Sequence, residues 1–143
     1  GKIRIPINEP SDDKSQIQEY LEAYRGEGIQ HIALGSDDIY ATVETLSANG
    51  IRFMDVPDAY YEAVDERVPG HGEDLSLLKK NQILIDGTLQ SEGGLLLQIF
   101  TQTVIGPIFF EIIQRKGNQG FGEGNFQALF EAIEREQLQR GVI

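Results

Sequence analysis

The sequence contains no cysteine among its 143 residues, so disulfide bonds and thiolate metal sites are excluded. Basic residues are also scarce, because 12 Lys and Arg stand against 23 Asp and Glu and leave a formal net charge of −11. An acidic surface repels phosphate backbones and anionic lipids, which argues against a nucleic-acid or membrane partner. No apolar run approaches the roughly 20 residues that a membrane helix needs, and no N-terminal signal pattern is visible. We therefore expect a cytoplasmic protein that is long enough for one domain with a real hydrophobic core.

The first residues of the chain already alternate between polar and apolar side chains, and they include Pro6 and Pro10. This pattern predicts a strand within residues 1–10 that ends at the prolines. Because domains seldom begin inside a strand, we expect the chain to be a fragment of a longer protein.

Hydrophobic spacing along the rest of the chain predicts an α+β domain. Helices are expected after a cap at Ser11 or Asp12, after a cap at Ser36, and after a cap at Asn125. Strands are expected over residues 29–34, 51–54, 83–87, 95–102 and 108–116, with two short helices in the polar segment 57–81. Residues 29–116 thus form a β-α-β-β-β unit with an insert, which predicts a curved mixed sheet with one concave face.

The two residues that stand out chemically are His31 and Glu111. His31 lies inside an apolar strand, where a buried histidine held by a hydrogen bond is the simplest interpretation. Glu111 has Phe109 and Ile113 two positions away on its strand, so its side chain lies on an apolar face. A carboxylate is seldom buried there unless it is paired or binds a metal, the alternative being an edge strand that turns it to water.

A histidine and a glutamate on neighbouring strands suggest part of an iron site with two histidines and one carboxylate. Such a site leaves three positions open for a chelating substrate and O2. The second histidine must then be His71 or must come from sequence outside this chain. His71 lies in the turn Pro69-Gly70-His71-Gly72, where a histidine is more often a cap or a surface residue.

Three further side chains are candidates with a simpler alternative. Gln98 lies between apolar neighbours on its strand and can orient a carbonyl or a phenol, or be satisfied within the core. Phe121 and Phe126 flank the last turn of a glycine-rich loop, where helix packing is the simpler role, above all for Phe126. The loop has no phosphate-loop spacing, and neither a serine elbow nor a cysteine nucleophile is present.

Six segments, taken in order, carry a more specific signal. They are Asn8-Glu9-Pro10, 15–18, 28–34, 96–100, 110–115 and 122–126. Each is weak alone, but together they resemble the 4-hydroxyphenylpyruvate dioxygenase family of the vicinal oxygen chelate superfamily, which is built from paired β-α-β-β-β modules. The resemblance implies that the sheet is half of an open barrel and that residues 1–143 are a single C-terminal catalytic-module fragment. Its parts would be the last strand of the preceding module (1–10), the final module (29–116) and a lid helix (125–143).

The resemblance also implies roles for individual residues. His31 and Glu111 would bind Fe(II), with the first histidine ligand in the preceding module and His71 outside the metal centre. The residues implied in catalysis are Gln98, Gln16 and Phe126. The residues implied in substrate binding are Asn8, Gln30, Phe100 and Phe121. Strict strand alternation points Gln30 away from His31, so a bulge is needed for both to face the pocket.

The implied reaction is the oxidative decarboxylation of 4-hydroxyphenylpyruvate by O2 to homogentisate and CO2, a step of tyrosine catabolism. One alternative is 4-hydroxymandelate synthase, which hydroxylates the benzylic carbon and tends to carry a smaller aliphatic residue where this chain has Phe126. Another is a metal-free binding module of the same fold, against which the burial expected for Glu111 argues. A third is that the chain alone is catalytically incomplete. The expected partners are a small-molecule 2-oxo acid and further copies of the chain, joined as a homo-oligomer through the open sheet.

Overall fold

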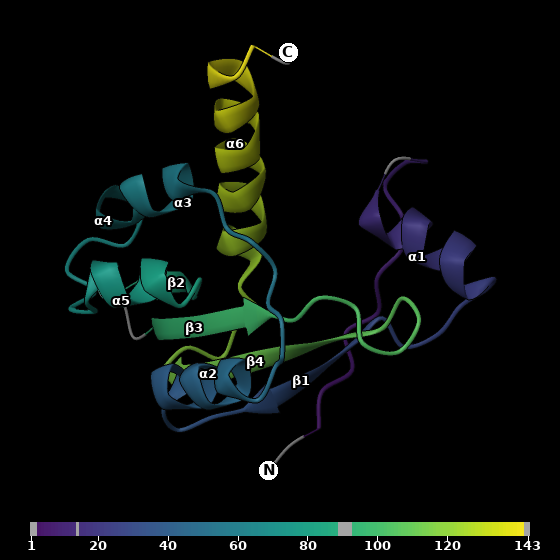
Figure 1. Cartoon of the computed structure of the whole chain (residues 1–143), viewed down its shortest axis with the longest axis horizontal. Helices are drawn as coiled ribbons and strands as arrows, with labels where there is room; N and C mark the ends of the chain where they lie inside the picture. The colour runs from purple at the N-terminus through teal and green to yellow at the C-terminus, as the bar shows by residue number, and fades with distance from the viewer. Residues whose placement is uncertain (1–2, 14, 89–92, 142–143) are drawn as a thin grey trace.

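The computed structural model describes residues 3–13, 15–88 and 93–141 (Figure 1). Its helices are α1 (Gln16–Tyr24), α2 (Ile39–Ala48), α3 (Asp58–Glu62), α4 (Val64–Arg67), α5 (Leu75–Lys80) and α6 (Glu123–Gln139). Its strands are β1 (His31–Gly35), β2 (Leu84–Thr88), β3 (Gly94–Phe100) and β4 (Phe109–Lys116). The order from β1 to β4 is β-α-β-β-β with an insert of short helices, so the expected α+β class is confirmed.

The four strands form one open mixed sheet in the order β1-β4-β3-β2. β1 runs parallel to β4, while the β4–β3 and β3–β2 pairs are antiparallel. A parallel pair needs a long crossover, and here the whole segment from α2 to β3 supplies it. The first and last strands of the unit therefore lie side by side, and β1 and β2 form the two edges.

The two faces of the sheet differ in chemistry because side chains alternate along each strand. Leu97 and Ile99 of β3 lie on one face and share a core cluster with Ile39 and Val43 of α2. Gln98 lies between Leu97 and Ile99, so its side chain points to the opposite face, and it is also fully buried. One face is thus ordinary apolar core, and the other holds buried polar groups.

Two of the predicted helix caps are wrong by a few residues. α1 is capped by Ser15, whose Oγ accepts a hydrogen bond from the first turn, rather than by Ser11 or Asp12. α2 is capped by Asp38 and not by Ser36. The Ser36 hydroxyl instead accepts a hydrogen bond from the Asp38 backbone N–H, so it supports the residue that caps the helix.

Three other local predictions also need correction. Residues 3–10 form no strand, because a strand needs a neighbour to pair with and the described chain offers them none. Residues 51–54 contribute only a single bridge between Phe53 and Thr101. The polar insert holds three short helices instead of two. The expected role of residues 1–10 as the last strand of a preceding module remains a prediction.

The C-terminal helix α6 begins two residues earlier than predicted. It starts at Glu123, so Asn125 is a residue of the helix and not its cap, and Asn125 is buried with 1% exposure. In Figure 1 α6 stands away from the sheet as a long column, and its first turn is the part that meets the strands. No helix in the described ranges is both long and apolar enough to cross a bilayer.

The buried face of β3 gives the first testable prediction. Leu97 is 0% exposed, so Leu97→Ala should lower the free energy of unfolding by about 2–5 kcal/mol through lost burial and the cavity left behind. Leu138→Ala in α6 is the control, since that side chain is 62% exposed and should change stability by less than about 0.5 kcal/mol. Urea denaturation of the full-length protein measures both values, and equal effects would show that this face is not core.

Candidate metal and substrate site

The parallel pairing of β1 with β4 brings His31 and Glu111 together. His31 lies opposite Phe109 and Ala33 lies opposite Glu111, so His31 and Glu111 project from adjacent strands on the same face. The distance from His31 Nε2 to Glu111 Oε2 is 3.5 Å. Glu111 is buried, with 6% exposure, which rules out the alternative of an edge carboxylate in water. The expected proximity is thus observed, and the ligand roles stay a prediction.

The side chain of Gln30 contacts the ring nitrogen of His31 that faces away from the carboxylate. Gln30 Oε1 lies 3.2 Å from His31 Nδ1, and an amide oxygen can only accept a hydrogen bond. The tautomer with the proton on Nδ1 satisfies this contact and leaves the Nε2 lone pair toward Glu111, an arrangement that a cation between the two groups would stabilise. The bulge expected at Gln30 is not needed, because β1 begins only at His31 and strand alternation does not apply to the residue before it.

These two side chains fit a divalent metal ion. A neutral imidazole nitrogen and a carboxylate oxygen are the donor types of non-haem iron sites. Two donors bound about 2.1 Å from one ion lie about 3.0–3.4 Å apart, which is close to the observed 3.5 Å. Within residues 3–13, 15–88 and 93–141 no group of three or more His, Cys, Asp or Glu side chains could hold a metal. His31 and Glu111 therefore form at most part of a ligand set.

Aromatic rings form a wall beside His31. The Phe109 ring stacks on the imidazole, with centroids 5.1 Å apart and an interplanar angle of 15°. The Phe100 ring meets His31 edge-on at 6.4 Å. Phe126, from the first turns of α6, lies 6.2 Å from Phe100 and remains 54% exposed. The structure thus joins two of the predicted aromatic site residues, Phe100 and Phe126, to the histidine.

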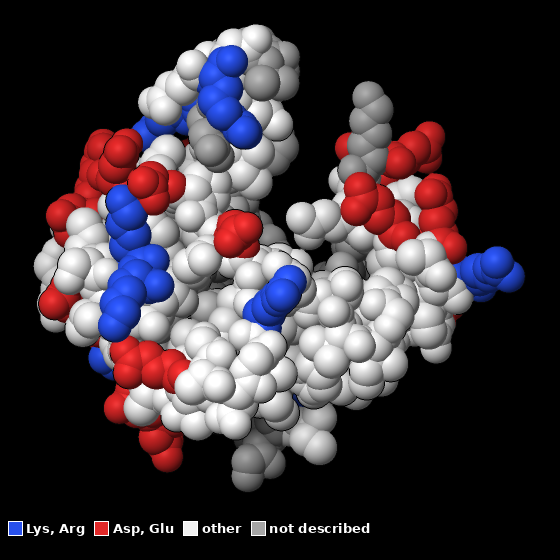
Figure 2. Space-filling view, in the orientation of Figure 1, with Lys and Arg blue, Asp and Glu red and all other residues white. Residues whose placement is uncertain are grey.

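A groove of about 550 Å³ opens beside this wall. Its lining residues are Gln16, Glu19, Tyr20, Ala23, Gln30, Met54, Thr103, Gly106, Pro107 and Phe109. Figure 2 shows a hollow between α6 and α1 whose floor is mostly uncharged, and the residues that line the groove include part of α1 and none of α6. The groove brings together Gln16 and Gln30, which are both predicted site residues from separate elements.

The other predicted site residues do not line this groove, and two of them, Asn8 and Phe121, also form no hydrogen bond or ring contact with His31 or Glu111 within the described residues. Asn8 is exposed in the N-terminal segment and is not among the residues that line the groove. Phe121 is 42% exposed, and the guanidinium of Arg4 lies over its ring at 6.0 Å from the centroid. Arg4 also donates a hydrogen bond to the backbone carbonyl of Gln119, so the N-terminal segment and the loop before α6 are joined.

Gln98 links Glu111 to α6. Its Nε2 donates to Glu111 Oε1 at 2.8 Å, and its Oε1 accepts from Asn125 Nδ2 at 2.7 Å. The loop residue Gly122 has a positive φ of 76°, and a Cβ there would lie 1.7 Å from Gln98 Oε1. The amide is therefore enclosed by the protein, and its bond to Glu111 uses one of its two N–H groups.

The sequence interpretation missed the residues behind Gln98. The Tyr60 hydroxyl of α3 donates to Asn125 Oδ1 at 2.6 Å, and Arg67 of α4 donates to the Tyr60 oxygen at 2.8 Å. Burial raises the pKa of Tyr60 to about 12, against the lowering effect of the Arg67 charge. No local pattern in the polar insert points to this role, because the contact with Asn125 spans 65 positions along the chain.

Both ring nitrogens of His71 form hydrogen bonds with neighbouring residues of the insert. Its Nδ1 accepts a hydrogen bond from the Glu73 backbone N–H at 2.9 Å. Its Nε2, which then carries the proton, donates to Asp65 Oδ1 at 2.9 Å. Both ring nitrogens are therefore engaged, one with α4 and one with the turn that holds His71, and the position of His71 outside the metal centre remains a prediction.

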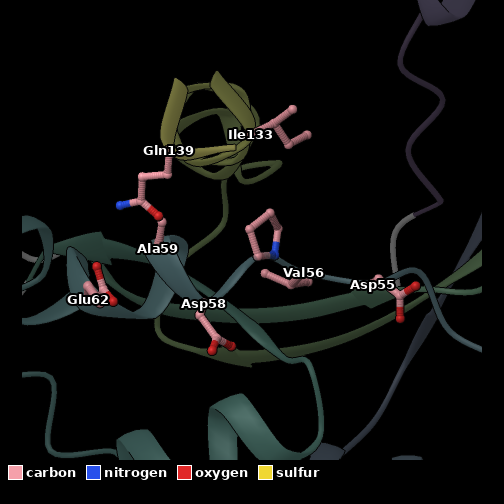
Figure 3. Close-up of a pocket in the computed structure, with 8 residues that line it drawn as sticks. Asp55, Val56, Asp58, Ala59, Glu62, Ile133 and Gln139 are labelled. Atoms are coloured by element: carbon pink, nitrogen blue, oxygen red, sulfur yellow. The ribbon is translucent and has the colours of Figure 1, made fainter. Parts of the chain in front are cut away.

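A second cavity of about 610 Å³ lies between α3 and α6 (Figure 3). Its lining residues are Asp55, Val56, Pro57, Asp58, Ala59, Glu62, Ile133 and Gln139. It contains three carboxylates but neither His31 nor Glu111, and one of them, Asp58, forms an ion pair with Lys79 at 3.1 Å. It is therefore separate from the candidate site.

The comparisons with known proteins agree with this geometry. A sequence model of the Glyoxalase/Bleomycin resistance protein/Dioxygenase superfamily matches residues 1–68. The chain is 68% identical over 143 residues to a 4-hydroxyphenylpyruvate dioxygenase of Pseudomonas aeruginosa, which is all of this chain and 40% of that protein. It is also 68% identical over 143 residues to Hemolysin VllY of Vibrio vulnificus, again 40% of that protein. The chain thus spans about two fifths of the length of these relatives.

A solved structure supports the same relationship. A mutant of 4-hydroxymandelate synthase from Streptomyces coelicolor superposes with a TM-score of 0.69 at 39% sequence identity. The match covers 85% of this chain and 34% of that chain. The fold expected from the sequence, an open mixed sheet of the glyoxalase and dioxygenase superfamily, is therefore confirmed.

The environment of Tyr60 gives a prediction about pH. Because the pKa of Tyr60 in the folded protein, about 12, exceeds the ordinary value of 10.0, the folded state holds this proton more tightly than the unfolded state does. The resulting stabilisation is fully present below pH 10 and is lost as the pH rises toward 12. The difference between the tyrosinate absorbance titrations of the wild type and Tyr60→Phe should show one group ionising near pH 12. Ionisation of that group near pH 10 would contradict the buried hydrogen-bonded hydroxyl.

Proposed function

We propose, for a chain related over its whole length to the 4-hydroxyphenylpyruvate dioxygenases, that the protein converts 4-hydroxyphenylpyruvate and O2 to homogentisate and CO2 with Fe(II). The observation that carries the proposal is the pairing of His31 Nε2 with the buried Glu111 carboxylate at 3.5 Å. A buried carboxylate is costly unless a positive charge lies beside it, and a bound divalent ion would provide that charge. A second histidine from outside the described residues would complete the ligand set.

Bound Fe(II) would supply the centre at which a 2-oxo acid chelates and O2 is activated. The residues of the protein would hold the metal and orient the substrate. His31 and Glu111 would bind the metal, and the remaining N–H of Gln98 would donate to an oxygen of the substrate beside Glu111. The hydrogen bond from His31 Nδ1 to Gln30 fixes the ring orientation, an outer contact of the kind that raises metal affinity.

The groove and the aromatic wall would receive the phenol ring of the substrate. Phe100 and Phe126 offer ring faces, and Gln16 and Gln30 offer amide groups along the groove. Phe126 is 54% exposed, so a bound ring packed against it would bury apolar surface and exclude water from the site. In this arrangement α6 acts as a lid.

Asn8 and Phe121 are proposed to join the substrate site from one side. The contacts of Arg4 with Gln119 and with the Phe121 ring support this, because they hold the N-terminal segment against the loop before α6.

The surrounding context of the activity is also proposed. The reaction belongs to tyrosine breakdown, which places the protein in the cytoplasm with a small-molecule 2-oxo acid as its substrate. Ile32 and Leu34 on the edge strand β1 are 42% and 48% exposed, which supports association through this edge into a homo-oligomer. The net charge of −11 supports the absence of a nucleic-acid or anionic-membrane partner.

A second candidate function is 4-hydroxymandelate synthesis, which the 4-hydroxymandelate synthase structure at 39% identity favours. The bulky Phe126 argues for attack on the ring, because it restricts how far the substrate ring can tilt away from the metal. A metal-free binding module is disfavoured, since it would leave the buried Glu111 without a countercharge other than His31.

The two histidines allow a direct test of the metal assignment. In the full-length protein, His31→Ala should lower Fe(II) affinity by more than the roughly 10–100-fold that loss of an outer-shell partner costs, and should abolish turnover. His71→Ala is the control and should leave the iron content near that of the wild type, because the ring nitrogens of His71 bond to Asp65 and to the Glu73 backbone and not to His31 or Glu111. Iron content by metal analysis and homogentisate formation decide the result. If only the His71 variant lost its iron, His71 and not His31 would be the metal ligand, and the assignment would be wrong.

The side chain of Phe126 allows a test of the reaction outcome. Phe126→Ile should give the substrate ring room to tilt, so that the benzylic carbon competes with the ring carbon. A shift of about 1 kcal/mol between the two barriers changes the product ratio roughly fivefold. Chromatography should then show product diverted from homogentisate to 4-hydroxymandelate. Pure homogentisate at a reduced rate would mean that Phe126 only packs.

A further inference from the structure

A line of hydrogen bonds begins in the insert, away from the candidate metal. The Tyr60 oxygen accepts from Arg67 Nη2 at 2.8 Å and from the Ile85 backbone N–H at 2.9 Å. Both of these groups can only donate. The Tyr60 hydroxyl has two acceptors within reach, Asn125 Oδ1 at 2.6 Å and the Ile85 carbonyl at 3.1 Å, and the shorter contact directs its single proton to Asn125. Tyr60 is 1% exposed, so no water competes for these positions.

The direction of the remaining bonds follows from this first one. Asn125 uses its oxygen for Tyr60, so its Nδ2 is the group that faces Gln98 Oε1 at 2.7 Å. The Gln98 Nε2 is then turned to Glu111 Oε1 at 2.8 Å. With the Gln98 amide reversed, an amide oxygen would face the carboxylate and repel it. Each amide therefore has one orientation, which Tyr60 fixes at one end of this line of hydrogen bonds and Glu111 fixes at the other.

The first turn of α6 is anchored by a second contact in the same region. Asp86 of β2 accepts a hydrogen bond from the Gly124 backbone N–H at 3.0 Å, and its other oxygen lies 3.7 Å from Arg67 Nη1. A Cβ at position 124 would lie 2.5 Å from that carboxylate, so the helix can approach only with glycine there. The negative charge of Asp86 at the N-terminal end of α6 also interacts favourably with the helix dipole. The anchored first turn of α6 thus fixes the position of Asn125 relative to Gln98.

From this geometry we infer that Tyr60, held by Arg67, is a positioning residue for the metal site, and this rests on the proposed function. Tyr60 acts through Asn125 and Gln98 to keep one Glu111 oxygen engaged in the protein. The other oxygen is left facing His31 Nε2, where a metal would bind. Neither Tyr60 nor Arg67 needs to touch substrate or metal for this role.

The test removes one hydroxyl in the full-length protein. Tyr60→Phe leaves the ring in place but removes the group that fixes the Asn125 amide. The affinity for Co(II), a spectroscopic substitute for Fe(II), should fall roughly 10–100-fold, the range for loss of an outer contact of a metal ligand. In the metal-free protein, the side-chain amide protons of Gln98 and Asn125 should lose their protection from solvent exchange, as measured by NMR with labelled glutamine and asparagine.

Tyr61→Phe is a matched control from the same helix. Tyr61 is 3% exposed, and its hydroxyl has no hydrogen-bond partner in the described part of the chain. Its removal should leave Co(II) affinity and both amide signals unchanged. Equal losses in the two variants would overturn the inference, because both would then reflect general loosening. Unchanged affinity and unchanged amide protection in Tyr60→Phe would overturn it as well.

A second variant covers the case in which Tyr60→Phe does not fold, which circular dichroism would show. Asn125→Leu preserves size but can neither donate nor accept, so it should reproduce the loss of Co(II) affinity and of Gln98 amide protection. Normal Co(II) affinity in a folded Asn125→Leu protein would refute the inference.

The proposed function fails in a different way. If wild-type protein binds Co(II) no better than His31→Ala, the metal assignment is wrong, whatever Tyr60 does. The amide signals of the metal-free protein then still decide whether Tyr60 orients Gln98 against Glu111.

Discussion

The rest of the site depends on the burial of one carboxylate. Glu111 lies on a sheet face among large apolar side chains with only 6% exposure, where an ionised group without partners would be costly. Its two oxygens have different neighbours, since one accepts a hydrogen bond from Gln98 and the other faces His31 at 3.5 Å. The side of Glu111 toward β3 is therefore satisfied by the protein, and the side toward β1 is open to a cation.

This requirement explains why the insert and α6 are placed where they are. β2 is an edge strand, and such strands leave backbone groups that need partners. Here the Tyr60 hydroxyl accepts from the Ile85 N–H, and Arg67 donates to the Ile85 carbonyl at 2.8 Å. The same two side chains reach α6 through Asn125. Tyr60 and Arg67 thus both cover the edge of the sheet and help to orient the buried amides.

The fold alone does not select the reaction product. The relatives include a 4-hydroxyphenylpyruvate dioxygenase at 68% identity, and a 4-hydroxymandelate synthase structure at 39% identity superposes with a TM-score of 0.69. Function resides in the side chains placed on the sheet, and under the proposed function the choice between the two products would fall on the aromatic wall and on Phe126 in particular. The chain spans about two fifths of the relatives' length.

The sequence by itself determined the four strands of the sheet, the α+β class and the proximity of His31 to Glu111. It could do so because alternation along a strand is local and a lone acid among apolar residues is conspicuous in any context. Only the tertiary structure decided that Gln30 contacts His31, that Asn125 is buried inside a helix instead of capping it, and that Tyr60 and Arg67 stand behind Gln98. These contacts join residues of separate elements or depend on where an element begins. Hydrogen bonds of this kind are set by the packing of helix against sheet, which no local pattern records.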